Sequence, residues 1–329
     1  MRIGVLCSGG DSPGMNACLR AVVRSGILGG HEVIGIRRGY QGLLEADVYI
    51  TPDGRREMTL GSVADIIQHG GTILRSSRSE EFKSAEGTRK AADNLQQLGI
   101  DALIPIGGDG TLCGAVHLLK HWDGQIVGCP GTIDNDLLGT DYTIGFHTAV
   151  ATAVDAVDKL RDTAESHGRM FLVEVMGRHS GYIALYTALA SGAAVVCIPE
   201  TRTDLGDIAA RLERMQRRGR SSIMVIVAEG DELGGVEPIL EKLRACDCPF
   251  SMRTIQLGHI QRGGSPAPAD RILGTRLGEF AVRSILAGAT NVMAGQVQQE
   301  MVLTPLKETF AAHKPVPEAL VALQEQLAG

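Results

Sequence analysis

The sequence predicts an α/β protein made of two doubly wound lobes, each built on a mostly parallel sheet. Its 329 residues suffice for two medium domains of roughly 150 residues each. Short β-branched runs alternate along the chain with longer stretches of helical period. The 42 glycines make up about 13% of the chain against an average of ~7%, which indicates many tight turns and close approaches of the main chain.

The first strand and helix of this alternation are predicted at residues 3–7 and 15–27. Further apolar runs predict strands at residues 33–36, 102–106, 126–129, 170–175, 194–198, 223–227 and 254–257. Two other helical stretches stand out by their apolar periodicity, residues 146–166 and 269–286. Nearly continuous apolar strands separated by helices predict parallel sheets that are covered on both faces. We expect a larger lobe of residues 1–145 with 261–311 and a smaller one of residues 146–260 with 312–329.

Charge and composition exclude several classes of protein. Lys and Arg number 32 against 38 Asp and Glu, so the net charge of −6 gives no global attraction to nucleic acid or to an anionic membrane. No apolar run approaches the ~18 residues of a membrane span, and no signal-peptide pattern opens the chain. Seven scattered cysteines indicate reduced thiols. We therefore expect a cytoplasmic protein without nucleic-acid or membrane partners.

A glycine-rich loop follows the first predicted strand. Residues 8–16 read Ser-Gly-Gly-Asp-Ser-Pro-Gly-Met-Asn and lead into a helix. Ligands of open α/β sheets bind beyond the carboxyl ends of the strands, and main-chain amides at a helix N-terminus suit an anion. The alternative is a glycine turn that serves packing only.

A second glycine-rich loop, residues 106–111, places three glycines around Asp109 and Thr111. Glycines let a phosphate chain lie against the main chain, where a carboxylate repels it unless a divalent cation lies between them. Asp109 is therefore a candidate Mg²⁺ ligand, and the alternative is that it caps the next helix. Neither loop has the pattern of a P-loop or of a dinucleotide-binding site.

A third loop, residues 130–136, carries two carboxylates two positions apart. Asp134 and Asp136 are flanked by Thr132 and Asn135. Such a pair can accept a substrate proton and support a metal shell, and phosphoryl transfer depends mostly on positioning the attacking hydroxyl. The alternative is an Asp-x-Asp turn that is satisfied by its own backbone.

Four arginines adjoin strand ends or glycine-rich turns: Arg169, Arg178, Arg253 and Arg262. Guanidinium groups grip phosphate in a bidentate manner, and four of them in an acidic protein favour an anionic ligand. Each taken alone is as well explained by a surface or salt-bridge role. His259 can bond a phosphate or be structural. The arginine-rich run at residues 211–220 fits either a solvated helix face or an effector-anion site.

Five motifs in this order, residues 8–16, 107–111, 130–136, 176–178 and 258–264, closely resemble the bacterial 6-phosphofructokinase family. The resemblance spans most of the chain. It implies a phosphofructokinase-like fold with a larger ATP-binding lobe and a smaller lobe for fructose 6-phosphate. It also implies transfer of the ATP γ-phosphoryl group to the 1-hydroxyl of that sugar with Mg²⁺, giving fructose 1,6-bisphosphate and ADP.

The resemblance assigns roles to single residues of this sequence. It makes Asp134 the catalytic base, with Thr132, Asp136 and Arg178 beside it, and Asp109 the Mg²⁺ ligand. ATP contacts map onto Gly10, Arg78, Gly108, Asp109, Gly110 and Thr111. Sugar-phosphate contacts map onto Thr132, Asp134, Met176, Gly177, Arg178, Glu229, His259 and Arg262. Arg169 and Arg253 would come from a neighbouring subunit, which implies a homo-oligomer, either a tetramer or a dimer.

The same resemblance bears on the phosphoryl donor. Pyrophosphate-using relatives tend to carry Asp at the position of Gly110 and Lys at that of Gly131, so two glycines here imply ATP. A pyrophosphate-dependent enzyme remains the first alternative. An NAD or lipid kinase shares only the Gly-Gly-Asp-Gly-Thr string. A non-catalytic nucleotide-sensing module would lack Asp134 or Asp109.

Regulation by an effector is a further expectation from the resemblance. The basic residues of the family's effector site map onto Arg20, Arg24, Arg161, Arg218 and Arg220. An acidic residue expected near Ala194 and a basic one expected near Leu60 are missing. We therefore expect altered or weak allostery.

Overall fold

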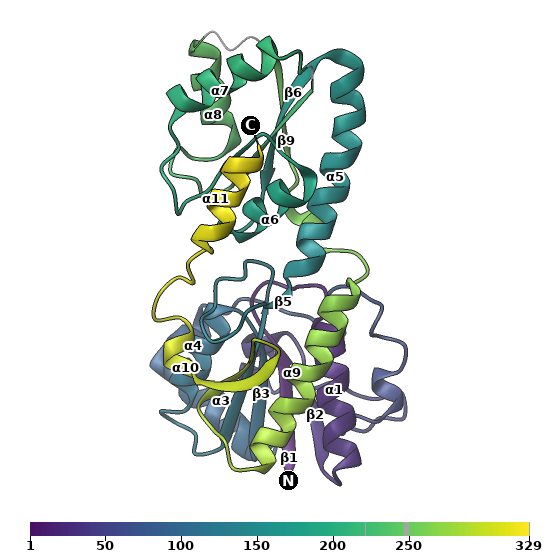
Figure 1. The fold of residues 1–329 in the computed structure, drawn as a ribbon. Coiled ribbons are helices and arrows are strands. Elements are labelled where there is room, and N and C mark those ends of the chain that lie inside the picture. Colours follow the sequence, from purple (N-terminus) through teal and green to yellow (C-terminus); the bar gives the residue numbers. More distant parts are fainter. Residues whose placement is uncertain (221, 247–249, 329) are drawn as a thin grey trace. The chain divides into compact units, whose positions relative to one another are not determined.

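The computed structural model describes residues 1–220, 222–246 and 250–328, and the chain in it divides into two units (Figure 1). The first unit consists of Met1–Ile133, Leu137–His147 and Arg262–His313. The second consists of Asp134–Asp136, Thr148–Gln261 and Lys314–Gly329. Asp134–Asp136 belong to the second unit, whereas the larger lobe expected from the sequence includes them.

The first unit is built on one sheet with the strand order β11-β10-β4-β3-β1-β2, and β5 pairs with β4. All pairs are parallel except β10 with β11. The strands are β1 (Arg2–Cys7), β2 (Glu32–Ile36), β3 (Ala102–Gly107), β4 (Gln125–Thr132), β5 (Ile144–Gly145), β10 (Val292–Val297) and β11 (Glu300–Pro305). The three central strands β4, β3 and β1 are almost entirely buried, as expected for a sheet covered on both faces.

Helices cover both faces of this sheet. Neighbouring residues of a strand point to opposite faces, so they join two different cores. Val5 and Ile104 join a core with α1 (Met15–Leu28) and α9 (Pro268–Leu286). Leu6 and Leu103 join a core on the other face with α2 (Gly39–Leu44), α3 (Ala85–Gln97), α4 (Asp109–Leu118) and α10 (Leu306–Thr309). Short 3₁₀ turns lie at Gly61–Val63, Glu81–Lys83 and Gly258–Arg262.

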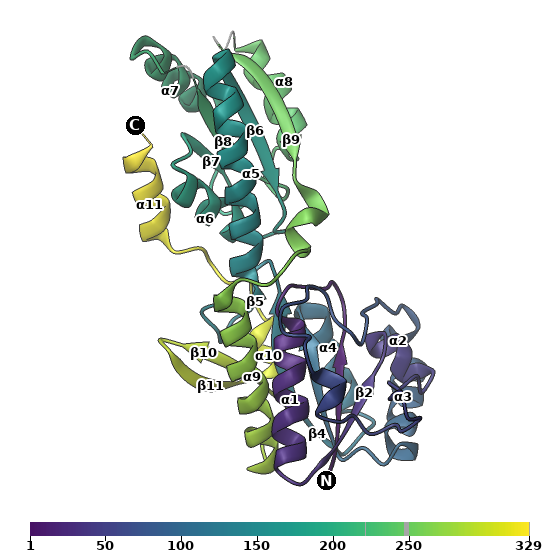
Figure 2. The same ribbon diagram turned by 90° about the vertical axis from the view of Figure 1, so that its right-hand side faces the viewer.

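Helices α1 and α9 lie side by side (Figure 2) and approach closely at two glycines. A Cβ on Gly278 would stand 2.4 Å from the carbonyl oxygen of Cys18, and one on Gly274 would stand 2.9 Å from that of Gly14. Glycines four residues apart share one helix face. The contact between these helices therefore depends on the absence of two side chains.

The second unit has a four-stranded, fully parallel sheet with the order β7-β8-β6-β9. Its strands are β6 (Arg169–Val175), β7 (Val195–Cys197), β8 (Ile223–Ala228) and β9 (Ser251–Gln256). Its helices are α5 (Phe146–His167), of which residues 148–167 belong here, α6 (Tyr182–Ser191), α7 (Leu205–Arg217), α8 (Val236–Ala245) and α11 (Glu318–Leu327). A core between the sheet and helices α7 and α8 includes Leu172, Val225, Leu212 and Leu240.

The predicted fold class is confirmed. Every predicted strand and helix is present, although the last predicted strand, β9, begins at Ser251 rather than at residue 254. Helix α11 and the β10–β11 hairpin had not been predicted. Within the described residues, no helix combines the length and the apolarity needed to cross a bilayer. The cysteines of the described ranges are free thiols, and Cys248 lies outside those ranges.

Replacing Gly278 with Ala tests the close packing of α1 and α9. We expect Gly278→Ala to lower the free energy of unfolding by about 1–3 kcal/mol, because the methyl group meets main-chain atoms of α1. Alanine favours a helix over glycine by about 1 kcal/mol, so an unstrained site would give the opposite sign. Chemical denaturation measures the change. Glu279→Ala, at the exposed next position, serves as control and should stay within about 0.5 kcal/mol.

Candidate functional site

In the first unit, two glycine-rich loops meet at the carboxyl ends of β1 and β3. The hydroxyl of Thr111 donates a hydrogen bond of 3.0 Å to the carbonyl oxygen of Ser8, and both residues are buried. A Cβ on Gly107 would lie 2.3 Å from that hydroxyl and 2.5 Å from that carbonyl oxygen. Only glycine fits there. The loops that the sequence singled out separately therefore form one surface.

A third segment joins this surface and brings Arg78 to it. The amide of Gly9 donates to the carbonyl oxygen of Ser77 at 3.2 Å, and the hydroxyl of Ser76 donates to the carbonyl oxygen of Gly9 at 2.6 Å. Gly9 has a φ of +83°, in the left-handed region that favours glycine. Arg78 directly follows this pair and is exposed. The structure thus places Arg78 beside the loop that contains Gly10.

Asp109 stands at the start of α4 but does not cap it. The N-cap is Gly108, and Asp109 lies in the first turn with an exposed side chain. The alternative of a capping aspartate is therefore wrong. An exposed carboxylate beside two glycines fits Mg²⁺, which prefers oxygen ligands and is usually held by one or two carboxylates together with substrate phosphates. Within the described residues, no group of three or more acidic, His or Cys side chains forms a complete metal cage.

The two glycines associated with donor choice differ in their surroundings. A Cβ on Gly110 would meet no atom within 4 Å. A Cβ on Gly131 would stand 2.9 Å from the Cε of Met15, 3.1 Å from the Cγ2 of Ile106 and 3.2 Å from the amide nitrogen of Gly107. Gly110 therefore borders open space, whereas Gly131 is packed on all of these neighbours. A long side chain at position 131 requires the core to move.

Arg262 lies in the first unit, against the first glycine loop. Its Nη1 is 2.1 Å from the point where a Cβ of Gly10 would stand, so the guanidinium group takes the place of a side chain there. Its Nε is buried and has no hydrogen-bond partner among the described residues. His259, which the sequence analysis grouped with Arg262, belongs to the second unit and is exposed. The chain passes from one unit to the other between these two residues.

Asp134 and Asp136 belong to the second unit, and their main chain is tied to it at two points. The buried hydroxyl of Ser180 donates to the carbonyl oxygen of Asp134 at 2.8 Å. The amide of Lys314 donates to the carbonyl oxygen of Asp136 at 3.3 Å. Asn135 between them has a φ of +53° and is fully buried. Segments far away in the sequence therefore hold this turn.

The loop Met176–Arg178 is held by two side chains through its main-chain amides. The carboxylate of Glu229 accepts hydrogen bonds from Gly177 at 3.2 Å and from Arg178 at 2.8 Å. The side-chain oxygen of Gln261 accepts one from Met176 at 2.9 Å. Arg178 has a φ of +53°, a conformation that costs a non-glycine residue free energy. Glu229, predicted as a substrate contact, acts here on the backbone of the loop.

Arg169 and Arg253 lie on adjacent parallel strands and share one sheet face. Arg253 pairs in register with Phe171, two residues after Arg169, and alternate residues of a strand face the same side. Strand β9 is at the edge of the sheet, and Arg253 on it is exposed. Neither arginine forms an ion pair within the part of the chain that the structure describes.

The arginines assigned to an effector site are distributed over both units. Arg20 and Arg24 lie on α1 of the first unit. Arg161 on α5 donates to the carbonyl oxygen of Ser191, and Arg218 and Arg220 follow α7 in the second unit. Ala194 is buried in the core of that unit, and Leu60 is 36% exposed.

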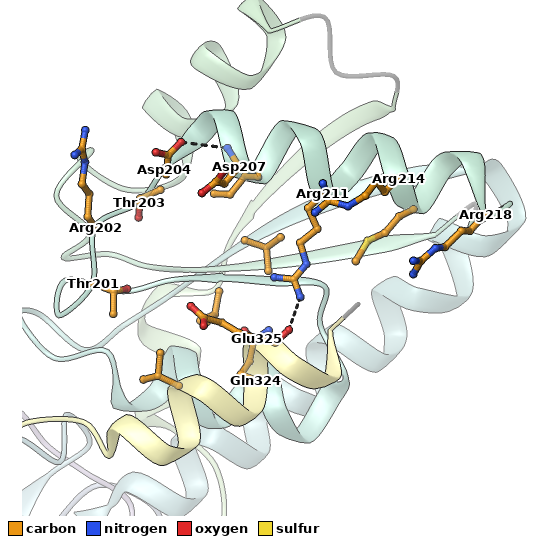
Figure 3. A pocket seen from close by; sticks show the side chains of 15 residues that line it. Thr201, Arg202, Thr203, Asp204, Asp207, Arg211, Arg214, Arg218, Gln324 and Glu325 are labelled. Carbon is orange, nitrogen blue, oxygen red and sulfur yellow. Dashed lines mark hydrogen bonds between the residues drawn. The ribbon is translucent and has the colours of Figure 1, made fainter.

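A cavity of about 560 Å³ in the second unit lies between α7 and α11 (Figure 3) and includes one of these arginines. Arg218 lines it together with Arg214 and Arg211, which lie about one and two turns earlier on α7. Figure 3 shows Arg211 pointing toward α11, where its guanidinium group donates to the carbonyl oxygen of Glu325 at 3.0 Å. Burial of Arg211 lowers its pKa, and the charge of Arg214 adds to this effect. Three arginines of the run at residues 211–220 thus line this cavity.

Sequence reasoning missed two residues that organise the site. Ser180 holds Asp134, and Gln261 holds Met176. Gln261 sits inside a motif that the sequence analysis had already singled out, between the basic residues His259 and Arg262. No sequence signal distinguished Ser180 from an ordinary loop serine.

These loops and cationic side chains define an α/β protein built to bind phosphorylated ligands, and three comparisons identify its family. The family model described as Phosphofructokinase matches residues 2–285. The chain is 52% identical over 327 residues to ATP-dependent 6-phosphofructokinase 1 of Thermus thermophilus, with 99% of each chain covered. It is 47% identical over 328 residues to ATP-dependent 6-phosphofructokinase of Cytophaga hutchinsonii, covering 100% of this chain and 98% of that one.

A solved structure agrees with these relatives. The structure of Pichia pastoris phosphofructokinase in the T-state superposes with a TM-score of 0.87 at 35% identity. The match covers 99% of this chain and 37% of the longer yeast chain. The chain belongs to the phosphofructokinase family.

The contrast between Gly110 and Gly131 yields a stability prediction. We expect Gly131→Ala to lower the free energy of unfolding by about 1–3 kcal/mol, because its methyl group meets Met15, Ile106 and the main chain of Gly107. Gly110→Ala, on a helix and in open space, should leave the free energy of unfolding unchanged or raise it by up to about 1 kcal/mol. Urea titration of both variants measures the difference. Equal effects of the two substitutions would contradict the packing at Gly131.

Proposed function

We propose that this chain transfers the γ-phosphoryl group of ATP to the 1-hydroxyl of fructose 6-phosphate, giving fructose 1,6-bisphosphate and ADP. The observation that carries this proposal is the identity of 52% over nearly all of both chains to an ATP-dependent 6-phosphofructokinase. The protein is a phosphotransferase that acts on an alcohol group, and its reaction belongs to glycolysis. We further propose the cytoplasm, the compartment of phosphorylated sugars, as its location.

The first unit supplies the nucleotide side of this reaction. Main-chain amides of Gly10, Gly108, Gly110 and Thr111 would lie along the phosphates, because glycine lets a phosphate chain approach the backbone. Arg78 beside this surface would offset the negative charge of the transferring group. Asp109 would hold Mg²⁺, which when bound supplies positive charge to the β- and γ-phosphates.

The second unit supplies the base and the sugar side. Asp134 would accept the proton of the 1-hydroxyl. Asp136, and Thr132 from the first unit, would orient the reacting groups. Arg178 would stabilise the transition state, on a loop that Glu229 and Gln261 hold in one conformation. Met176, Gly177, Glu229 and His259, with Arg262 of the first unit, would bind the sugar phosphate.

We propose that Arg169 and Arg253 act on the sugar phosphate of a neighbouring subunit, which makes the protein at least a homodimer, and we expect a homotetramer. Two features support this role. Both arginines share one face, and Arg253 is exposed on an edge strand. Both also lack a carboxylate partner within the described chain, so their charge is available to an anion.

The surroundings of Gly110 and Gly131 support ATP over pyrophosphate as the donor. The open space at Gly110 leaves room for the α-phosphate of a nucleotide. The tight packing at Gly131 leaves none for the lysine that pyrophosphate-using relatives tend to carry. Pyrophosphate dependence is the alternative that an assay distinguishes directly.

We also propose an effector-anion site with weakened regulation. Arg20, Arg24, Arg161, Arg218 and Arg220 supply its positive charge. Ala194 provides no carboxylate for an effector's cation, and Leu60 provides no positive charge.

Replacing Asp134 with Ser tests the proposed base. We expect Asp134→Ser to lower kcat by about 10²–10⁴-fold, the contribution typical of general base catalysis, with little change in the KM for either substrate. A coupled assay for fructose 1,6-bisphosphate measures both constants. Asp155→Ser, which removes an exposed carboxylate on α5, is the control and should retain full activity. Unchanged turnover of Asp134→Ser would exclude Asp134 as the base.

A comparison of donors tests the choice of ATP. We expect turnover with ATP and at most traces with pyrophosphate at equal concentrations. Gly110→Asp should lower kcat/KM for ATP about tenfold or more, since like charges facing each other cost several kcal/mol. The same assay tests the proposed weak regulation: ADP and phosphoenolpyruvate, added as candidate effector anions, should change the rate of the parent enzyme little. A higher rate with pyrophosphate than with ATP would overturn the assignment of the donor.

A further inference from the structure

The turn Asp134–Asp136 is fixed to the second unit through two carbonyl oxygens. Ser180 donates its hydroxyl hydrogen to the carbonyl oxygen of Asp134 at 2.8 Å. The amide of Lys314 donates to that of Asp136 at 3.3 Å. Ser180 and Asp134 are 3% and 4% exposed, so water competes little for the bond between them. The position of the Asp134 carboxylate therefore depends on what holds Ser180 and Lys314.

Tyr182 holds the second of these partners. Its hydroxyl donates to the carbonyl oxygen of Pro315 at 2.9 Å, and the Nζ of Lys314 lies 4.9 Å from the centre of its ring. A cation over an aromatic face is attracted by the ring. Tyr182 is 3% exposed, so it contacts the Lys314–Pro315 segment from inside the second unit. The tyrosine thus fixes this segment both by a hydrogen bond and through its ring.

Ser180, the other residue that holds the aspartate turn, directly precedes the N-terminal end of α6. The main-chain amide of Tyr182 donates to the hydroxyl oxygen of Ser180 at 3.4 Å, which orients that hydroxyl group toward Asp134. The amide of Gly181, the N-cap of α6, donates to the carboxylate of Glu200 at 2.8 Å. The N-terminal end of α6 is therefore anchored. Ser180 and Tyr182, the two residues that hold the aspartate turn, both lie at this end.

The other end of the Lys314–Pro315 segment is also fixed. Helix α11 follows it within three residues, and the side-chain amide of Gln324 on that helix donates to the carbonyl oxygen of Ala193 at 3.2 Å. Gln324 is 3% exposed. The segment is consequently held on both sides of its contact with Asp136.

We propose that Ser180 and Tyr182 are positioning residues of the phosphoryl-transfer reaction, acting on Asp134 through the backbone of its turn. Ser180 acts directly on the Asp134 carbonyl, and Tyr182 acts through Lys314–Pro315 on the Asp136 carbonyl. This inference rests on the proposed role of Asp134 as the base. Neither side chain needs to touch a substrate.

The isosteric substitution Tyr182→Phe is the most specific test, because it removes the bond to Pro315 and keeps the ring beneath Lys314. Small displacements of a reacting group cost large factors in rate, about 10²-fold for 1 Å. We expect kcat to fall about five- to tenfold, with KM for ATP and for fructose 6-phosphate changed less than twofold. Rates are expressed per folded molecule, with the folded fraction taken from thermal unfolding.

Thr187→Val is the matched control on the same helix. Thr187 is fully buried, and its hydroxyl has no partner among the described residues, so the substitution removes a buried hydroxyl from α6 without breaking a bond. We expect parental kcat. An equal loss of kcat in both variants would show a general effect on α6 and overturn the role of Tyr182.

A double-mutant cycle separates positioning from simple destabilisation. If Tyr182 acts through Asp134, then Tyr182→Phe has no further effect on the residual rate of Asp134→Ser. The same five- to tenfold loss in that background would overturn the proposal, as would parental kcat in Tyr182→Phe alone. Full activity of Asp134→Ser would instead overturn the proposed base itself, and with it this inference.

Ser180 is tested by a pair of substitutions. Ser180→Ala removes the donor to the Asp134 carbonyl and should lower kcat about tenfold at nearly constant KM. Ser180→Thr keeps a hydroxyl and should recover at least half of the lost rate. Equal kcat values in the two variants would contradict the role of the hydroxyl group.

Discussion

The surface formed by the two glycine-rich loops of the first unit depends on one buried hydrogen bond, from the hydroxyl of Thr111 to the carbonyl oxygen of Ser8. It joins the ends of two parallel strands that lie far apart in sequence. The bond is possible because Gly107 has no side chain, so the main chain passes within contact distance of both groups. This junction also positions Arg78 and Asp109. Arg78 follows Ser76 and Ser77, which bond to Gly9, and Asp109 follows Gly108, the N-cap of α4.

The second unit arranges its functional groups by a different means. Here polar side chains bind main-chain groups of the loops, as Glu229 and Gln261 do at Met176–Arg178 and Ser180 does at Asp134. The bonds of Gln261 to Met176 and of Ser180 to Asp134 are buried, where leaving either group unpaired costs free energy. Such anchoring supports the left-handed conformation of Arg178.

Much of this protein could be predicted from local sequence. Apolar runs of β-branched residues identified the strands, and glycine clusters located the loops, because both signals lie within a few neighbouring residues. Helix α11 escaped prediction because its buried residue is the polar Gln324, so apolar periodicity gives little signal for it. The contact of Arg262 with Gly10 and the bond of Ser180 to Asp134 escaped because each joins separate segments of the chain. Sequence patterns report local periodicity, whereas these contacts depend on how distant segments meet.

The order of segments along the chain has a consequence for biosynthesis. The chain changes unit five times, and the partner of α1 in the first unit, α9, begins at Pro268. While the ribosome is still making the intervening residues, the apolar face of α1 has no helix to cover it. Chains of this kind expose hydrophobic surface until late in translation, a state that chaperones commonly protect. An expression host that is rich in chaperones should therefore give the better yield of native enzyme.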